Sequence, residues 1–237
     1  ANLTQHSGDS KLAKVSGGSK LNLTATSTLV VDVIAEHANN TYQSMEADMA
    51  LMSSTGEGSS IVNMGNISTP TVGNLLLGAE NGASVENKGT ISVSSVSATQ
   101  SADTADDFVM GAFKGATATN SGTISVINTQ EKAVGSGNYH NQAPFSPGWR
   151  HHYVMVGNDN TSLENTGEIN INGVSTWGMA VTNHSSAVNK ATGTINLDGF
   201  RPVTDENGVI TSKADAGLVG DKYQSAAMMA GNEGGAS

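Results

Sequence analysis

The sequence predicts an all-β protein, a right-handed parallel β-helix (a three-strand β-solenoid) with loop insertions on one side. Three observations carry this prediction. One short phrase, apolar-x-Asn-x-Gly-x-Ile-x-apolar, recurs along the chain, and an apolar run that ends in a small or polar turn precedes each copy. Only 4% of the residues are aromatic and 28 of the 237 are glycine, so a stack of thin apolar layers fits the composition better than a core of large rings.

The recurring phrase is typical of a corner followed by a strand. Its copies span residues 61–68, 85–93, 118–126, 163–171 and 187–197, and the last copy has two extra residues. Side chains alternate along a strand, so the Ile and the apolar residue two positions later share one face, which we expect to line the interior. The Gly is expected to form a tight corner, because Gly accepts a positive φ.

The asparagine of the phrase has a structural interpretation. Stacked coils would place these side chains above one another, and each amide carries both donors and an acceptor, so it can bond to the amides on either side. The predicted ladder consists of Asn63, Asn87, Asn120, Asn165 and Asn189.

The spacing of the phrase predicts coils of about 24 residues with insertions. Its glycines occupy positions 65, 89, 122, 167 and 193, which are 24, 33, 45 and 26 residues apart. Three strands of roughly five residues and three turns account for the shortest step. The longer steps require extra residues at about 94–107, 128–152 and 198–224, which should emerge from one side of the rod. An Asn-Gly pair at 207–208 predicts a projecting β-hairpin in the third insertion.

The chain divides into an N-terminal part and an array of repeats. Residues 1–30 are expected to form a cap and the first strands. Residues 31–237 are expected to form β-helix repeats that stop within the last repeat, because 228–237 match 75–84. One stretch, 35–52, has a helical pattern, although its last four residues also fit the apolar strand of the repeat.

Composition and charge argue against several classes of function. Lys and Arg number 11 against 21 Asp and Glu, a net charge of −10 without a basic cluster, so nucleic acid is not expected as a partner. The chain has no cysteine, which leaves neither a disulfide framework nor a thiolate metal site. No apolar run approaches the roughly 20 residues that span a bilayer.

The Asn-x-Gly-x-Ile phrases and their apolar-Gly runs resemble the β-helix of autotransporter passenger domains over about residues 55–237. The resemblance implies an extracellular, cell-surface adhesin, exported across the outer membrane of a Gram-negative bacterium with the help of a C-terminal β-barrel of the parent protein. Such passengers also include proteases and esterases, so the resemblance is specific for architecture and weak for activity.

The second insertion carries the most unusual side chains, in the segment 147–153. Three interpretations are open: a packed loop, a patch that contacts a ligand, and a metal site. Adjacent histidines of an extended segment point to opposite faces and no carboxylate lies close by, so metal is the weakest of the three. Trp, Tyr and Arg dominate binding at the centres of interfaces. The ligand-binding candidates are Trp149, Arg150, His151, His152, Tyr153, Phe200 and Arg201.

No catalytic residue, cofactor or metal is predicted. The Gly-Asp-Ser at 8–10 continues with Lys-Leu, unlike the motif of serine protease passengers, and no histidine has an Asp three residues before it, as an esterase of the Gly-Asp-Ser-Leu type requires. The acidic segment 103–107 lacks a recognised calcium spacing.

We therefore predict a function in adhesion. A rigid rod would present one long face to a host surface protein, a host glycan or another copy of itself, the last leading to autoaggregation and biofilm. Two alternatives are open: a polysaccharide-acting enzyme on the same scaffold, and an inert stalk for an activity elsewhere in the parent protein. Against the enzyme, Glu86 and Glu164 are equivalent outward positions two repeats apart rather than a close acid pair.

Overall fold

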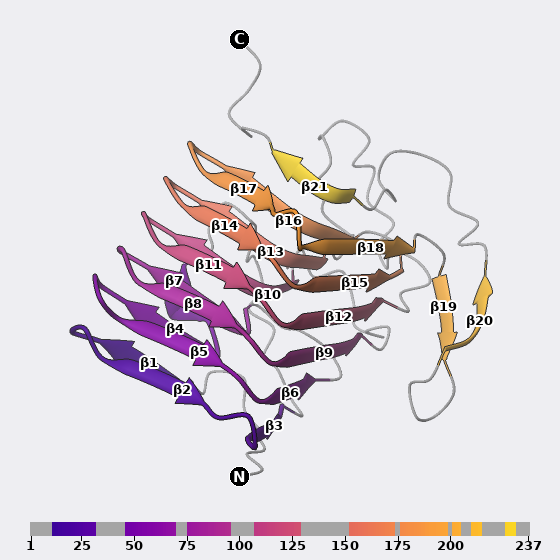
Figure 1. The fold of residues 1–237 in the computed structure, drawn as a ribbon, viewed down its shortest axis with the longest axis horizontal. Coiled ribbons are helices and arrows are strands. Elements are labelled where there is room, and N and C mark those ends of the chain that lie inside the picture. The colour runs from indigo at the N-terminus through magenta and orange to yellow at the C-terminus, as the bar shows by residue number, and fades with distance from the viewer. Residues whose placement is uncertain are drawn as a thin grey trace, which may run out of the picture.

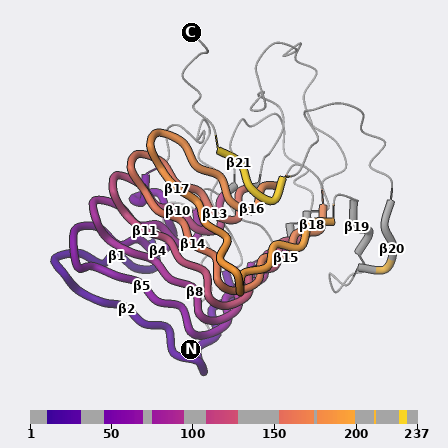
Figure 2. Tube along the Cα trace, turned by 45° about the horizontal axis from the view of Figure 1, so that its top comes forward, coloured from indigo at the N-terminus to yellow at the C-terminus, as the bar shows by residue number. Residues whose placement is uncertain are grey.

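The protein is a right-handed parallel β-helix in a computed structural model that describes residues 11–31, 46–69, 75–95, 107–128, 152–173, 176–198, 201–204, 210–214 and 226–230. In these residues three parallel sheets run along the rod, and each coil contributes one strand to each sheet in the order A, B, C (Figure 1). The coils lie side by side as a regular stack from the N-terminal end to the C-terminal end (Figure 2). The predicted fold is confirmed.

Sheet A contains β1 (Ala13–Ser16), β4 (Met52–Thr55), β7 (Leu77–Glu80), β10 (Asp107–Phe113), β13 (His152–Asn158), β16 (Thr176–Thr182) and β21 (Ala226–Ala230). Sheet B contains β2 (Lys20–Leu23), β5 (Ser60–Asn63), β8 (Ser84–Asn87), β11 (Thr117–Asn120), β14 (Ser162–Asn165) and β17 (Ser186–Asn189). Sheet C contains β3 (Thr28–Val30), β6 (Asn66–Thr69), β9 (Thr90–Ser95), β12 (Thr123–Asn128), β15 (Glu168–Asn172) and β18 (Thr194–Asp198).

Equivalent residues of successive coils stack in register and form the core. Ile67 pairs with Ile91, and Ile91 pairs with Ile124, all at 1% exposure or less. One interior column of each sheet consists of Met52, Leu77, Met110, Met155 and Met179 in sheet A, Ile61, Val85, Ala118 and Leu163 in sheet B, and Ile67, Ile91, Ile124 and Ile169 in sheet C. Each large side chain buried in this way contributes about 1.5–3 kcal/mol, so the interior follows from the alternation in the repeat.

The five predicted asparagines form a ladder inside the corner between sheets B and C. Each Nδ2 donates to the Oδ1 of the asparagine in the next coil, at 2.8 Å from Asn63, Asn87 and Asn120 and at 2.7 Å from Asn165. Asn63 to Asn165 have no exposed surface, and Asn189 ends the ladder. The ladder satisfies amides that would each cost about 1–3 kcal/mol if buried without partners.

The glycines of the phrase are required for a reason that differs from the predicted one. None of these five has a positive φ, so the expectation of a left-handed corner is wrong. A Cβ built on Gly89 would overlap the carbonyl oxygen of Gly65, and one on Gly122 would overlap that of Gly89. The cause is a hydrogen bond between coils, because Thr90 N–H donates to Gly65 O at 2.9 Å and draws the two corners together. Glycine is therefore selected by close backbone approach.

Positive φ values occur instead at the corner between sheets A and B. Pairs of left-handed residues turn the chain there, as in Asn81-Gly82 and Lys114-Gly115. Later coils use Asp159-Asn160 and Asn183-His184 at the same place. Gly and Asn adopt this conformation with least strain, which explains why the polar turn follows the apolar run in the sequence.

A second apolar layer covers the outward side of sheet A. Phe108, Tyr153 and Trp177 come from β10, β13 and β16 and stack face to face, with successive ring centroids 5.1 Å apart. All three are at most 5% exposed. Ala47 and Ala50 belong to the same cluster. Strands β10, β13 and β16 are thus buried on both sides, which explains why they are nearly continuous apolar runs.

Residues 47–50 cross the outward side of sheet A at its N-terminal end. The short 3₁₀ helix η1 (Ala47–Met49) and Ala50 lie over Gly78, where a Cβ would clash with Ala47 and Ala50. Lys11 and Lys14 hydrogen-bond to Asp48 at 2.5 and 2.8 Å, and these bonds lower the pKa of Asp48 to about 2. An apolar strand was expected at residues 49–52, but strand β4 begins only at Met52.

The first described strands form a coil of their own. β1, β2 and β3 pair with β4, β5 and β6 in the same parallel register as later coils. The proposed division into a cap at 1–30 and repeats at 31–237 stays a prediction. The register corrects the alignment of residues 228–237 with residues 75–84. Met228 pairs with Met179, which lies in the column of Leu77, so Met228 is equivalent to Leu77 and not to Leu75. The similar apolar runs allowed the two-residue slip, which only the hydrogen-bonded register resolves.

The connections that vary most in length all join sheet C to sheet A of the next coil. The chain leaves β9, β12 and β18 and rejoins sheet A at β10, β13 and β21, which confirms the predicted bounds of the three insertions to within two residues. The residues between these strands lie mostly outside the described part. In the third insertion, β19 (Arg201–Thr204) pairs antiparallel with β20 (Ile210–Ala214), which confirms the predicted hairpin (Figure 1).

The ladder predicts a large effect of one substitution. Asn120→Ala removes the acceptor for Asn87 and the donor for Asn165, so we expect it to lower the free energy of unfolding by about 2–4 kcal/mol. Chemical denaturation followed by circular dichroism measures this loss. The control is Thr119→Ala, the outward neighbour on the same strand, for which we expect a change of less than about 0.5 kcal/mol. Equal effects of the two substitutions would contradict a stabilising ladder.

Candidate functional site

The outward residues of sheet C form a surface that the fold does not use for packing, here called the polar face. It combines two or three outward residues from each strand. Their inward neighbours in β3, β6, β9, β12 and β15 are buried. From the first coil to the last they are Thr28 and Val30, Asn66 and Ser68, Thr90, Ser92 and Ser94, Thr123, Ser125 and Ile127, Glu168, Asn170 and Asn172, and Thr194, Asn196 and Asp198.

Hydroxyl and amide groups dominate this face. Of these described outward residues, Glu168 and Asp198 carry charge, and both belong to the last two strands. The first four strands contribute uncharged side chains. Amides bond along the face where they occur in neighbouring coils, since Asn196 Nδ2 donates to Asn170 Oδ1 at 2.8 Å. The polar face is thus a regular array of hydrogen-bonding groups on rigid strands.

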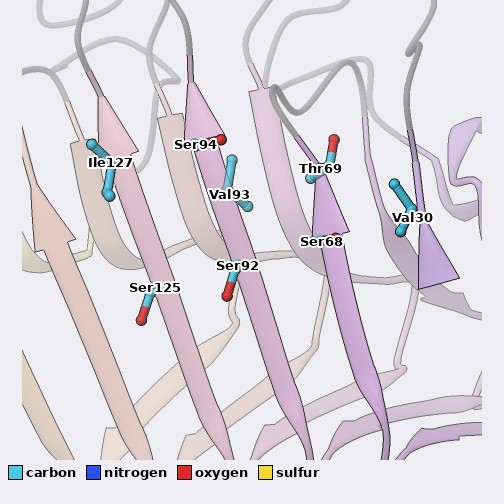
Figure 3. A pocket seen from close by; sticks show the side chains of 8 residues that line it. All are labelled: Val30, Ser68, Thr69, Ser92, Val93, Ser94, Ser125 and Ile127. Carbon is cyan, nitrogen blue, oxygen red and sulfur yellow. The ribbon is translucent and has the colours of Figure 1, made fainter. Parts of the chain in front are cut away.

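A shallow groove of about 400 Å³ lies on this face at the carboxyl ends of four strands (Figure 3). The serines at the same register position, Ser68, Ser92 and Ser125, line it along the rod. Its other lining residues are Val30, Thr69, Val93, Ser94 and Ile127. Figure 3 shows the lining side chains distributed over four adjacent strands, so the groove follows the rod axis across several coils.

The described lining residues of the groove offer hydrogen-bonding and aliphatic contacts. All eight described lining residues are Ser, Thr, Val or Ile, which offer hydroxyl hydrogen bonds and aliphatic contact but no ionisable group for general acid or base catalysis. Among the residues that the structure describes, no group of three His, Cys, Asp or Glu is placed to hold a metal ion. Nor does any described helix have the length and apolar character needed to cross a membrane.

The other two faces differ from the polar face. Sheet A is covered by the apolar cluster on its outward side. Sheet B carries ion pairs, with Lys88 3.3 Å from Glu86 and Lys190 3.2 Å from Glu164. Glu86 and Glu164 lie in one register column with Thr119 between them, so they are two coils apart, as expected from the sequence. Sheet B also has an outward hydroxyl column, formed by Ser60, Ser84, Thr117, Ser162 and Ser186. The column beside it contains the two glutamates, whereas the outward residues of the first four strands of sheet C are all uncharged.

The structure places few of the predicted ligand-binding residues. Trp149, Arg150, His151 and Phe200 lie outside the described residues, while the backbones of His152 and Arg201 belong to β13 and β19. For these residues ligand binding stays a prediction.

Tyr153 requires a correction. Its ring is fully buried between Phe108 and Trp177, because its position in β13 aligns it with these aromatic residues on the outward side of sheet A. Tyr153 is therefore a packing residue and not part of an exposed aromatic patch.

Sequence reasoning did not single out the polar face, although the signal was present. The variable residue after Ile in the phrase is Ser68, Ser92 or Ser125 in three coils. Alternation places this residue outward. Rare residues such as Trp and His placed the predicted binding site in the insertions. The polar face is built from common residues, which stand out only because they recur at the same register position.

Comparison with known proteins identifies related chains. A family model described as the BigA third pectate lyase-like domain matches residues 11–237. BigA of Salmonella typhimurium, provisionally named a surface-exposed virulence protein, is 30% identical over 205 residues, which are 85% of this chain and 10% of BigA. The chain thus spans about a tenth of the length of that relative. No solved structure matches it.

The two sides of sheet C predict a large effect of a buried charge and a small effect of an exposed one. Ser92 is exposed and its neighbour Val93 is 1% exposed, so Val93→Asp buries an unpaired carboxylate and should lower the free energy of unfolding by more than about 3 kcal/mol. Ser92→Asp should cost less than about 0.5 kcal/mol. Thermal and denaturant unfolding of both variants decide this, and a severe loss with Ser92→Asp would show that the polar face is needed for folding.

Proposed function

The chain belongs to the BigA third pectate lyase-like domain family, and we propose that it is an adhesive module of a cell-surface virulence protein that binds through its polar face. Its relative BigA is provisionally named a surface-exposed virulence protein, which supports a location at the cell surface. The resemblance to passenger domains supports export across the outer membrane by the autotransporter route. Both statements about the parent protein belong to the proposal.

The observation that carries the proposal is the polar face itself. The four strands β3, β6, β9 and β12 present uncharged outward side chains, mostly hydroxyls, in a chain whose net charge is −10. Rigid strands hold these groups, so binding costs little conformational entropy. Inward residues stabilise the fold, while the outward serines make no contribution to the core, which leaves them free for contact with a partner.

The spacing of the face favours a second copy of the chain as the partner. Neighbouring strands lie about 4.8 Å apart, so each hydroxyl column repeats at that interval along the rod. A second copy repeats at the same interval, and its hydroxyls stay in register over the whole contact. Two copies related by a two-fold axis would place the same face on both sides of a closed interface.

Charge supports the same choice of surface. Two chains of net charge −10 repel each other, although physiological salt screens charges beyond about 8 Å. If two copies meet through the first four strands of sheet C, no acidic side chain of one polar face lies opposite the same residue of the other copy. Contact through sheet B would instead bring the ion pairs Lys88–Glu86 and Lys190–Glu164 near the interface, where removing their charges from water costs free energy. Contact through the first four strands of sheet C avoids this cost.

A display experiment tests this proposal. Cells that do not otherwise clump would display the chain or a variant with Ser68→Asp, Ser92→Asp and Ser125→Asp. We expect the chain to cause clumping, measured as the rate of settling, and the variant to abolish it, because like charges about 4 Å apart cost on the order of 1 kcal/mol per pair even in water.

The matched control places the same charges on sheet B in the same coils, as Ser60→Asp, Ser84→Asp and Thr117→Asp. We expect this variant to clump like the unmodified chain. Equal loss in both variants would contradict a specific role of sheet C. Absence of clumping by the unmodified chain, together with binding or cleavage of a host glycan or polysaccharide, would contradict self-association and favour the other predicted partners or an enzyme.

A further inference from the structure

Residues 46–50, here called the strap, cross the outward side of sheet A and contact lysines of distant coils. Glu46 bonds to Lys114, which follows β10. Asp48 bonds to Lys11 and Lys14, of which the first precedes β1 and the second lies within it. Since β4 and β7 lie between β1 and β10 in sheet A, the strap links four coils of the rod.

The strap packs closely on the sheet because position 78 is a glycine. A Cβ at Gly78 would lie 2.9 Å from the Cβ of Ala50 and 3.0 Å from the Cα of Ala47. Both alanines are 1% exposed and belong to the apolar cluster that contains Leu75. A larger residue at position 78 would lift the strap from the sheet. The strap therefore covers apolar surface on the outward side of sheet A.

The closed strap leaves one polar group buried without a partner. Ser53 lies on β4 between Lys14 of β1 and Gly78 of β7. Its neighbour Met52 belongs to the inner core, so Ser53 points to the side of the sheet on which the strap lies. Ser53 is 2% exposed, and its Oγ has no hydrogen-bond partner among the described residues. Burial of an unpaired hydroxyl is unfavourable, so closure requires another source of stability.

Lys114 has a backbone conformation that favours other residue types. Its φ is +52°, and the other non-glycine residues with positive φ in the described part of the chain are all Asn, Asp or His. The equivalent corner positions of the neighbouring coils are Asn81 and Asp159. A lysine here costs conformational energy that an asparagine avoids. Its Nζ lies 2.7 Å from Glu46 and 4.0 Å from Glu80, so its contacts with acidic side chains offset that cost.

The ion pairs that hold the strap are accessible to dissolved salt. Asp48 accepts hydrogen bonds from Lys11 and Lys14, and these bonds lower the pKa of Asp48 from 3.8 to about 2. The side chains of these two pairs and of the Lys114–Glu46 pair are 32–53% exposed. Salt screens exposed charges, while the contacts of buried alanines do not depend on charge. Closure of the strap should therefore depend on ionic strength.

We propose that the strap is a salt-sensitive clasp, which three lysines hold closed over apolar surface of sheet A and which opens when salt screens its ion pairs. Opening uncovers Ser53 while the coils stay stacked, because the strap residues belong to none of the three sheets. Protonation of Asp48 removes its pairs only as the pH falls below about 4, so ionic strength is the trigger at neutral pH. The clasp lies on sheet A and is independent of the polar face on sheet C.

A single thiol beneath the strap reports whether it is open, because the chain has no cysteine. Ser53→Cys introduces this thiol at a position whose hydroxyl makes no hydrogen bond to the described residues. We expect a soluble thiol reagent to modify it about tenfold faster at ~1 M NaCl than at ~0.01 M NaCl, where the Debye lengths are about 3 and 30 Å. Val93→Cys, at a position 1% exposed inside sheet C, reports unfolding of the coils, and its rate should not change with salt.

Charge variants of the Ser53→Cys chain at low salt separate the clasp from a general loss of stability. Lys114→Asn removes the pair with Glu46 but suits the left-handed corner, so it should raise the modification rate about two- to fivefold without lowering the unfolding midpoint. Glu46→Gln should raise the rate equally, and the double variant should exceed neither. The matched control is Lys88→Gln, which removes an ion pair on sheet B and should leave the rate unchanged.

Three outcomes would overturn the proposal. The first is an equal modification rate of Ser53→Cys at the two salt concentrations. The second is a rate that Lys114→Asn does not raise. The third is a parallel acceleration of Val93→Cys by salt, because the coils themselves would then be loosening and the strap would not open by itself.

Discussion

The structure depends on in-register stacking at the corner between sheets B and C. There the amide ladder links Asn63 to Asn189 through successive hydrogen bonds of 2.7–2.8 Å, and backbone hydrogen bonds draw each glycine onto the carbonyl of the preceding coil. A shift of one residue would move every inward side chain of a strand outward. The corner therefore specifies the register, and the register places the apolar columns inside and the polar columns outside.

One cross-section repeated along a rod gives each face a separate role. Strands β10, β13 and β16 of sheet A are buried on both sides by the core and by the outer aromatic cluster, sheet B carries ion pairs, and sheet C presents hydroxyls and amides. Variation in length is concentrated in the connections from sheet C to sheet A, where it does not disturb the ladder. The groove on sheet C lies at the carboxyl ends of its strands, close to where these connections depart.

Sequence analysis predicted the architecture because repetition makes a weak local pattern unmistakable. It found the interior isoleucines and the asparagine column, and it bounded the three insertions, since each depends on spacing alone. It failed where three-dimensional proximity decides. Gly89 and Gly122 are required by a neighbouring coil that no local turn rule describes, and Tyr153 belongs to an internal stack although its neighbours suggested an exposed patch. The polar face was overlooked because no single serine is unusual.

The most direct test of contact through sheet C uses the absence of cysteine from the chain. Ser92→Cys places one thiol at the middle of the polar face, and Thr117→Cys places one on the exposed side of sheet B. Mild oxidation of each purified variant, followed by non-reducing electrophoresis, measures how often the two surfaces meet. Self-association through sheet C predicts a disulfide-linked dimer for Ser92→Cys and little for Thr117→Cys. Equal yields, or a dimer from Thr117→Cys alone, would contradict it.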